Sequence, residues 1–390
     1  MKNLIWAGMM ILFCWTVCFG DPQGIGQSGC STVPLMVRGP EVFISQQNLH
    51  DMGLENHDST LPVLNRADGC WIYLSEGGQS DGKHSNIHRV RMNGSSVDMS
   101  SARSVEVSGI PDANVNELNG WKGWVMNFYR ISEKEILAFI HYEDQERGFK
   151  EDFRMGLAYS DDEGASFRHV GFILSVELPS KMIKSGGVTT GKINIAGGGL
   201  RWDDRYFYYY FNDYSRPDRS DRHGAVARAS VQEVISSARS GGVSAWHKYY
   251  NGEWTEPGLG GRASSIGQVE NPSADVWSAW VVPGNHSYVM FNTFLGKWIT
   301  FAMKSSVITM TATADPLNFS GEPVVVHHLP EKTAAAYFTI VPSGKGEGFT
   351  CGQEFELWYR TWKDGEKPVI YNTERLLIHL GDKDIGGLEK

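Results

Sequence analysis

The chain has 390 residues, of which 45 are acidic and 36 are basic, so its formal net charge at pH 7 is -9. An acidic chain without basic runs argues against nucleic acid as a partner. Short runs rich in aromatic and β-branched residues alternate with Gly, Asp, Asn and Ser clusters, while amphipathic helices are nearly absent. This pattern predicts an all-β fold.

The first 20 residues have the pattern of a secretory signal peptide. Lys2 is followed by an apolar run from Leu4 to Phe19 and by Gly20. An apolar run of about 16 residues is short for a membrane span, and no later stretch is long enough for one. We therefore expect a signal peptide at residues 1–20, one domain over 21–390, and a secreted or periplasmic protein with no membrane partner after cleavage.

Three cysteines, Cys30, Cys70 and Cys351, follow the predicted signal peptide. An oxidising destination allows one disulfide and one free thiol. Their spacing resembles no metal motif, and His327-His328 has no further His or Cys at ligand spacing, so we assign no transition metal.

One rhythm of strands recurs five times along the chain. Each unit contains a strongly aromatic strand and a strand of small residues, separated by turn residues. The units occupy residues 58–92, 124–174, 197–254, 278–319 and 337–380, and residues 230–239 give the best short helix. Five units predict a five-bladed β-propeller with four-stranded antiparallel blades. A two-sheet sandwich is the alternative.

A ring of blades must also close. A propeller without pairing between its first and last strands leaves two open edges. We expect residues 31–37 to pair with the last unit, and a disulfide between Cys30 and Cys351 to reinforce that seam.

The turn at residues 160–167, Ser-Asp-Asp-Glu-Gly-Ala-Ser-Phe, matches the Asp-box pattern found in the blades of sialidase-like propellers. Asp162 can accept hydrogen bonds from its own turn, Gly164 can adopt a positive φ, and Phe167 can return to the apolar layer. A weaker version lies at residues 313–319. We expect this motif to be structural.

Several motifs together resemble the five-bladed propeller glycoside hydrolases, the superfamily of arabinofuranosidases, arabinanases and β-xylosidases. They are His-Tyr-Glu at 141–143, Gly-Ala-Val-Ala-Arg-Ala-Ser at 224–230 and Glu-Asn-Pro-Ser at 270–273, together with the signal peptide and the five-unit rhythm. The resemblance implies a glycan substrate, carboxylates around the mouth of the central channel, and no cofactor beyond a structural calcium ion there. We expect a monomer.

Antiparallel pairing places the start of the first strand of a blade and the end of the second at the same face. The active sites of this superfamily lie at that face. In this chain the face collects Asp58, Glu76, His141, Glu143, Asp213 and Glu270. We take His141 and Glu76 as candidates for substrate binding.

Glycoside hydrolysis needs one carboxyl group to protonate the leaving oxygen and another to activate water or to attack the anomeric carbon. We assign Asp58 as base or nucleophile, with Asp68 as the competing residue. Glu270 or Glu143 is the acid, and Asp213 is the residue that tunes it. The resemblance implies inversion.

Two further candidates for substrate binding are Trp71, whose ring could stack on a sugar, and Arg216, in a long loop that could bind carboxylated sugars or phosphate. Core packing is the alternative for Trp71, and a solvated loop for Arg216. The alternatives to a glycosidase are a non-catalytic carbohydrate-binding propeller and a sialidase-like enzyme, although no arginine triad is evident.

Overall fold

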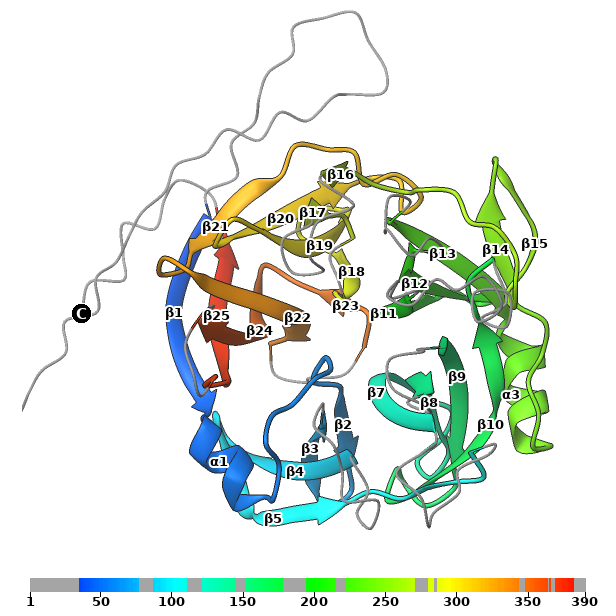
Figure 1. The fold of residues 1–390 in the computed structure, drawn as a ribbon, viewed down its shortest axis with the longest axis horizontal. Helices are drawn as coiled ribbons and strands as arrows, with labels where there is room; N and C mark the ends of the chain where they lie inside the picture. Colours follow the sequence, from blue (N-terminus) through cyan, green and yellow to red (C-terminus); the bar gives the residue numbers. More distant parts are fainter. Residues whose placement is uncertain are drawn as a thin grey trace, which may run out of the picture.

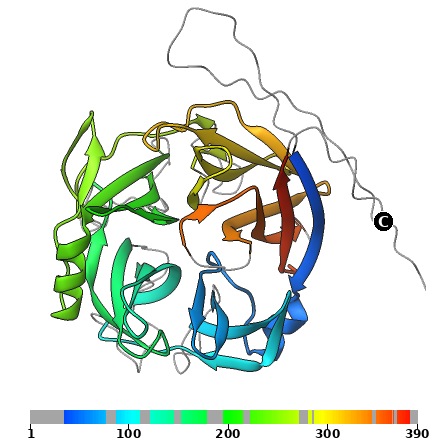
Figure 2. The ribbon, with the colours of Figure 1, turned by 180° about the vertical axis from the view of Figure 1, so that it is seen from behind.

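The structure is a computed structural model, and it describes residues 35–76, 87–110, 121–144, 152–177, 194–214, 222–270, 280–283, 286–343, 348–363, 365 and 369–381. Five sheets of four or five strands stand around a common centre (Figure 1), and the view from behind shows the same ring (Figure 2). The predicted five-bladed β-propeller is confirmed. Within the described residues, no helix is both long enough and apolar enough to span a membrane.

The first blade follows a short helix, α1 (Gln46–Asp51), that is capped by Ser45. Its four antiparallel strands are β2 (Val63–Arg66), β3 (Gly69–Ser75), β4 (Ile87–Asn93) and β5 (Ser96–Ser104). The aromatic strand β3 is almost fully buried from Trp71 onward. Hydrophobic side chains on both faces of this strand explain why it occupies an inner position in the sheet.

The second blade is the one that carries the Asp-box-like turn. Its antiparallel strands are β7 (Trp121–Arg130), β8 (Ile136–Asp144), β9 (Asp152–Ser160) and β10 (Phe167–Leu174), and β6 (Val107–Ser108) joins β10 in parallel. The unit predicted at residues 124–174 is therefore present as one blade. In this sheet β8 lies between β7 and β9, which explains its uninterrupted apolar run.

The third blade contains the longest run of tyrosines in the chain. Its strands are β11 (Asn194–Trp202), β12 (Tyr206–Tyr214), β13 (His223–Ser230), β14 (His247–Tyr250) and β15 (Glu253–Pro257). The predicted helix is present as α3 (Val231–Arg239), whose first turn is capped by the Ser230 side chain. It buries Val234 and Ala238, in keeping with the i, i+4 spacing of one helix face.

The fourth blade differs from the predicted strand assignment. It consists of β18 (Val289–Asn292), β19 (Lys297–Lys304), β20 (Val307–Thr313), β21 (Val324–His328) and the parallel strand β23 (Thr350–Cys351). The unit predicted to begin at residue 278 has its first blade strand only at Val289, because β17 (Trp280–Val281) pairs with β16 (Val269–Glu270) in a separate sheet. Val282 donates to Gln268 rather than to β19, and Pro283 has no N–H with which to continue a strand.

The fifth blade is closed by the beginning of the chain. Three strands come from the last unit and one from the first described residues: β22 (Thr333–Pro342), β24 (Glu354–Lys363), β25 (Asn372–Leu380) and β1 (Leu35–Ile44). Leu35 pairs with Leu380 and Val37 with Ile378. The predicted seam is therefore confirmed over Leu35–Val37, and β1 (blue) lies beside β25 (red) in Figures 1 and 2.

The predicted disulfide at this seam is not testable from these contacts, because Cys30 lies outside the described residues. Cys351 is a buried thiol that accepts a hydrogen bond from Asn292. Burial raises its pKa to about 12. It belongs to the same hydrophobic cluster as Leu35, the first described residue of the chain.

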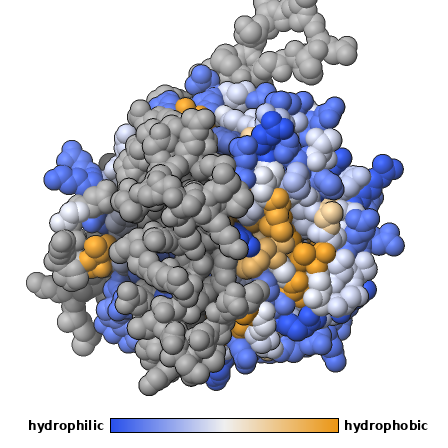
Figure 3. Space-filling view, turned by 45° about the vertical axis from the view of Figure 1, so that its right-hand side comes forward, coloured by the Kyte–Doolittle hydropathy of each residue, from blue (hydrophilic) through white to orange (hydrophobic). Residues whose placement is uncertain are grey.

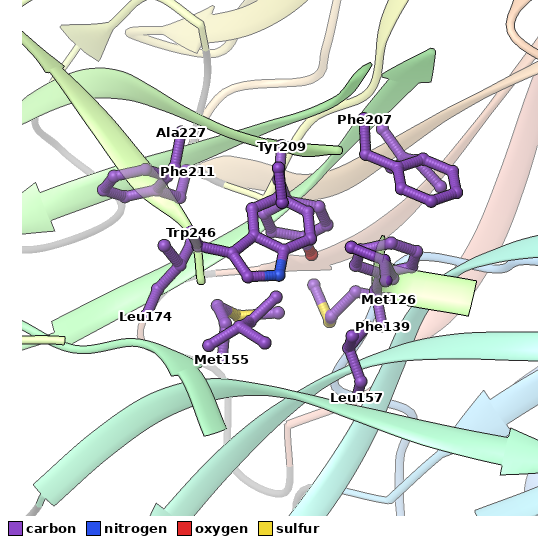
Figure 4. Packing of buried hydrophobic residues seen from close by; sticks show 14 of the residues in the cluster. Met126, Phe139, Met155, Leu157, Leu174, Phe207, Tyr209, Phe211, Ala227 and Trp246 are labelled. Atoms are coloured by element: carbon purple, nitrogen blue, oxygen red, sulfur yellow. The ribbon is translucent and has the colours of Figure 1, made fainter. Parts of the chain in front are cut away.

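Hydrophobic side chains fill the spaces between neighbouring blades. Between the second and third blades, Phe139 stacks on Tyr209 with ring centroids 5.1 Å apart, and Trp246 closes over them (Figure 4). Hydrophilic side chains predominate on the flank that lies to the right in Figure 1, with one group of hydrophobic residues toward the middle of the view (Figure 3). Aromatic packing between blades thus fixes the positions of the inner strands that carry the site.

The turn after β9 makes the contacts expected of its sequence. Asp162 Oδ1 accepts from the Ser166 N–H at 2.9 Å and from the Ser160 hydroxyl at 2.7 Å. Gly164 has φ +78°, and a Cβ there would lie 2.7 Å from a Leu64 methyl group. Phe167 is buried against the first blade. The side chain of Asp162 is therefore engaged within its own turn.

Candidate functional site

The candidate site lies at the strand ends that face the centre of the ring. The Asp58 N–H donates to the Ser75 carbonyl oxygen at 2.7 Å, so Asp58 sits beside the end of β3, as the strand-end argument predicts. Glu76, the residue after Ser75, is buried, and its carboxylate accepts a hydrogen bond from the Glu55 N–H at 3.0 Å. The first blade therefore contributes two carboxylates to this region.

Asp58 is held by two residues of the fifth blade. Its Oδ1 lies 2.7 Å from an Arg360 guanidinium nitrogen and accepts the Tyr337 hydroxyl at 2.6 Å. Burial by itself would raise the pKa of Asp58, but the Arg360 charge and the Tyr337 hydrogen bond outweigh it, and the pKa is lowered overall. The side chain keeps 32% exposure. Asp58 is therefore a carboxylate held ionised while still open to a small molecule.

Arg360 is fixed from several sides. One of its nitrogens donates to the His57 carbonyl oxygen at 2.5 Å, and its guanidinium group lies 4.7 Å from the centre of the Tyr337 ring. Burial and the nearby Arg360 charge lower the pKa of His57 to about 3, so this histidine is neutral at pH 7. The Thr373 hydroxyl contacts its ring at 2.5 Å. These contacts leave Arg360 little freedom to move away from Asp58.

A second acid–base pair comes from the end of β8. His141 Nδ1 lies 3.2 Å from the Ile195 carbonyl oxygen, and Nε2 lies 3.0 Å from Glu143 Oε1. A carbonyl oxygen only accepts, so Nδ1 must carry a hydrogen. The His141 ring therefore links the Ile195 carbonyl group on one side to the Glu143 carboxyl group on the other.

His286, just before β18, connects the two pairs. The centre of its ring lies 6.0 Å from that of His141 and 5.0 Å from that of Tyr337. Tyr337 in turn is subject to the negative charges of both Asp58 and Glu143, which contribute with burial to raising its pKa well above the usual value. Residues from four segments far apart in sequence therefore form one group.

Lys122 joins Glu76 to Glu143. It pairs with Glu143 across β7 and β8. Burial lowers the pKa of Lys122, while the charges of both Glu76 and Glu143 act in the opposite direction. Of the six residues that antiparallel pairing predicted at this face, four therefore lie together: Asp58, Glu76, His141 and Glu143.

Asp213 lies at the predicted strand end but faces a buried cation. It pairs with Ile195 on β11, and its Oδ2 lies 3.4 Å from Lys248 Nζ. Lys248 is fully buried and also donates to the carbonyl oxygens of Ser175 and Gly261 at 2.7 Å each. Because a buried ammonium group is costly without a counter-charge, balancing Lys248 is the observed role of Asp213. Its assignment as a tuning residue stays a prediction.

Glu270 lies in a different environment from the one expected. It is on β16, outside the five blades, and its carboxylate is 2.5 Å from Lys304 Nζ with 48% side-chain exposure. Its predicted placement at the start of the fourth blade is wrong. The first strand of that blade begins at Val289, whereas Glu270 pairs with Trp280 outside the blade. His286 occupies the place in the fourth blade where Glu270 was expected.

The two remaining candidates are not part of the described group. Trp71 lies five residues before Glu76 on an extended strand, about 16 Å away at 3.3 Å per residue. Its indole N–H donates to Asp68 at 2.8 Å, and the Arg89 guanidinium lies 4.9 Å from the centre of its ring. These contacts favour the packing role. Arg216 lies outside the described residues.

Sequence reasoning missed Tyr337, Arg360 and His286. Tyr337 and Arg360 lie within β22 and β24, in runs of apolar residues that predict core strands. Tyr337 lies at a register shift in the pairing of β22 with β24, between Ala336 and Thr339. No local sequence signal marks such a shift. An arginine within the apolar run of β24 is the one feature that could have been singled out.

The described residues contain no group of three or more His, Cys, Asp or Glu side chains that could hold a metal ion. The calcium ion implied by the resemblance therefore remains an expectation. The chemistry that the described group can perform is proton transfer, through Asp58 on one side and the His141–Glu143 pair on the other.

Among known proteins, the matches to this chain are solved structures. No protein-family model and no curated protein matches the chain. A hydrolase described as putative from Bacteroides ovatus has 11% identity and a TM-score of 0.48, covering 87% of this chain and 90% of its own. A levansucrase of B. megaterium has 11% identity and a TM-score of 0.46, covering 84% and 83%.

A GH43_1 enzyme of Xanthomonas citri, solved with xylose, has 11% identity and a TM-score of 0.43, covering 84% of this chain and 92% of its own. Similarity at this level carries no argument about the reaction of this chain. The five-bladed fold rests on the strand pairings described above.

Proposed function

We propose that the protein is a glycoside hydrolase that acts on a poly- or oligosaccharide. One observation supports this above the others: two carboxyl groups of one site have different partners. Asp58 contacts Arg360 and Tyr337, which hold it ionised, while Glu143 contacts the His141 ring. A pair of titratable groups set apart in this way is what acid–base catalysis requires.

In the proposed reaction Glu143 protonates the glycosidic oxygen as its bond to the anomeric carbon breaks. Asp58 takes a proton from a water molecule whose oxygen attacks that carbon. Following the family resemblance, we infer inversion, which needs about 6.5–9.5 Å between the two carboxyl groups to admit the water. A retaining mechanism would use Asp58 as the nucleophile instead.

The test is a glycan panel incubated with the protein produced from residue 21 onward, with products identified by mass and anomeric configuration by NMR. Asp58→Asn and Glu143→Gln should each lower turnover by about 10²–10⁴-fold. For substrates whose leaving groups need no protonation, turnover should fall little in Glu143→Gln but should still fall strongly in Asp58→Asn.

Glu270→Gln is the matched control, because Glu270 is exposed and paired with Lys304. It should retain activity; a loss confined to Glu270→Gln would move the acid to that residue. Binding of glycans without any turnover would instead support the non-catalytic carbohydrate-binding propeller. The proposed secretion is checked separately by N-terminal sequencing of protein recovered outside the cytoplasm, which should begin near Asp21.

A further inference from the structure

His286 occupies an unusual position between the two halves of the proposed site. Its ring lies between those of His141 and Tyr337, with centroid distances of 6.0 and 5.0 Å. The residue is 8% exposed, and its backbone N–H donates to Asn212 Oδ1 at 3.3 Å. A hydrogen bond from the third blade therefore holds the backbone while the ring reaches toward the first, second and fifth blades.

One ring nitrogen of His286, Nδ1, is buried with no hydrogen-bond partner among the described residues. Buried polar atoms in folded proteins are nearly always bonded, so an exception calls for an explanation. A ligand that supplies the missing hydrogen bond is one such explanation.

The backbone gives an independent observation. His286 has φ +54° and Tyr337 has φ +63°, a region that residues other than glycine seldom adopt. Among the described non-glycine residues with such angles, only these two have buried side chains. Strain of this kind persists where the surrounding structure enforces it, and it concentrates at functional sites.

The charge state of the ring fits a neutral ligand. Burial, together with the nearby His141, lowers the pKa of His286 to about 3. At pH 7 the ring therefore has one N–H donor and one acceptor nitrogen. A hydroxyl group of a sugar can therefore either accept from the ring or donate to it.

We propose that His286 binds a hydroxyl group of the sugar residue held between Asp58 and Glu143. This inference rests on the proposed function and names a substrate contact within that site. His286 is then the residue of the fourth blade that contacts substrate, at the place where Glu270 was expected. Its left-handed backbone orients the ring toward the sugar.

The experiment uses His286→Gly, which removes the ring and accepts the left-handed backbone without cost. We expect kcat/KM to fall at least tenfold, about the value of one neutral hydrogen bond, while the melting temperature stays within about 2 °C of wild type. His286→Asn, which also tolerates this backbone and retains an amide donor and acceptor, should recover part of the activity.

Lys332→Gly is the matched control, because Lys332 is an exposed left-handed residue with φ +61° in the turn before β22. It should leave kcat/KM unchanged. Monodeoxy analogues of the best substrate identify the contact: the deoxy change at the bound hydroxyl and His286→Gly should not be additive. Full additivity for every hydroxyl would overturn the proposal.

The two proposals fail in different ways. If wild-type protein binds a glycan but does not turn it over, the proposed function falls, yet weaker glycan binding by His286→Gly in titration calorimetry still assigns His286 to a ligand site. If His286→Gly lowers the melting temperature strongly while activity per folded molecule is unchanged, His286 is a packing residue and the inference is overturned.

Discussion

At the residue scale, the Asp58 carboxylate is defined by what surrounds it rather than by its own sequence position. Arg360 and Tyr337 approach one of its oxygens, and the charge of His286 when protonated would act in the same direction. Glu143 faces an imidazole whose other nitrogen is committed to a carbonyl oxygen. Two carboxyl groups of similar intrinsic acidity are thereby placed in different electrostatic surroundings.

The first prediction concerns Tyr337→Phe, which removes the hydroxyl donor and keeps the ring. The pKa of Asp58 should rise, so the acid limb of the kcat/KM profile should move to higher pH. Because folding lowers the pKa of Asp58, its ionisation stabilises the fold above the usual value of about 3.9, and this contribution is lost as pH falls through the lower folded value.

The difference in free energy of unfolding between wild type and Tyr337→Phe should therefore be larger at pH 6 than at pH values below about 3.9. Urea unfolding at a series of pH values measures it. Tyr359→Phe is a control, since this buried tyrosine lies on β24 near Glu374 and not beside Asp58. An unshifted acid limb in Tyr337→Phe would show that the hydroxyl does not control Asp58.

At the element scale, turns and register shifts decide which side chains face the centre of the ring. The turn at residues 160–167 fixes the junction of β9 and β10 through Asp162, whereas the related turn after β20 is held more loosely. Among the described residues, the Asp315 carboxylate accepts one hydrogen bond, from the Leu317 N–H to Oδ1 at 2.9 Å. The same kind of motif therefore carries different amounts of stabilisation in two blades.

The second prediction compares these two turns. Asp162→Ala should lower the free energy of unfolding by about 1–2 kcal/mol, because several hydrogen bonds to its carboxylate are lost. Asp315→Ala should cost less than Asp162→Ala. Both variants should keep full turnover per folded molecule, measured by urea unfolding and active-site-normalised kinetics. Loss of turnover at an unchanged melting temperature in Asp162→Ala would mean that the faces of the ring are assigned the wrong way round.

At the scale of the whole molecule, the ring is held closed by a strand from the opposite end of the chain. Leu35, Phe43 and Ile44 of β1 are buried, and β1 pairs with β25 over most of its length. The site depends on this closure because Tyr337 and Arg360 reach Asp58 from the blade that β1 completes.

The third prediction is that removing β1 destabilises the protein and opens an edge. A chain that begins at Ser45 should lose at least about 5 kcal/mol, since three large apolar side chains lose their burial at roughly 1.5–3 kcal/mol each. The exposed β25 should also promote association, which size-exclusion chromatography detects. A chain that begins at Leu35 is the control and should remain stable. Equal stability of the two truncations would show that β1 does not close the ring.

The sequence by itself determined the features that depend on local pattern. Strand periodicity and turn residues predicted the five units, α3, the closing segment and the turn at Asp162. The strand-end rule also brought Asp58 to Glu76 and His141 to Glu143, because antiparallel pairing fixes which ends of adjacent strands lie at one face. Apart from the closing segment, which pairs with the other end of the chain, these relations span a few tens of residues at most.

Only the tertiary structure decided how the halves of the site meet. Tyr337 contacts Asp58 across 279 residues of sequence, and that contact exists only after the ring has closed. The positions of Tyr337 and His286 depend on left-handed backbone angles that packing between blades enforces. Glu270 was misplaced for the same reason: whether residues 278–284 form the inner strand of a blade is settled by competition among strands, and the strand that begins at Val289 takes that place.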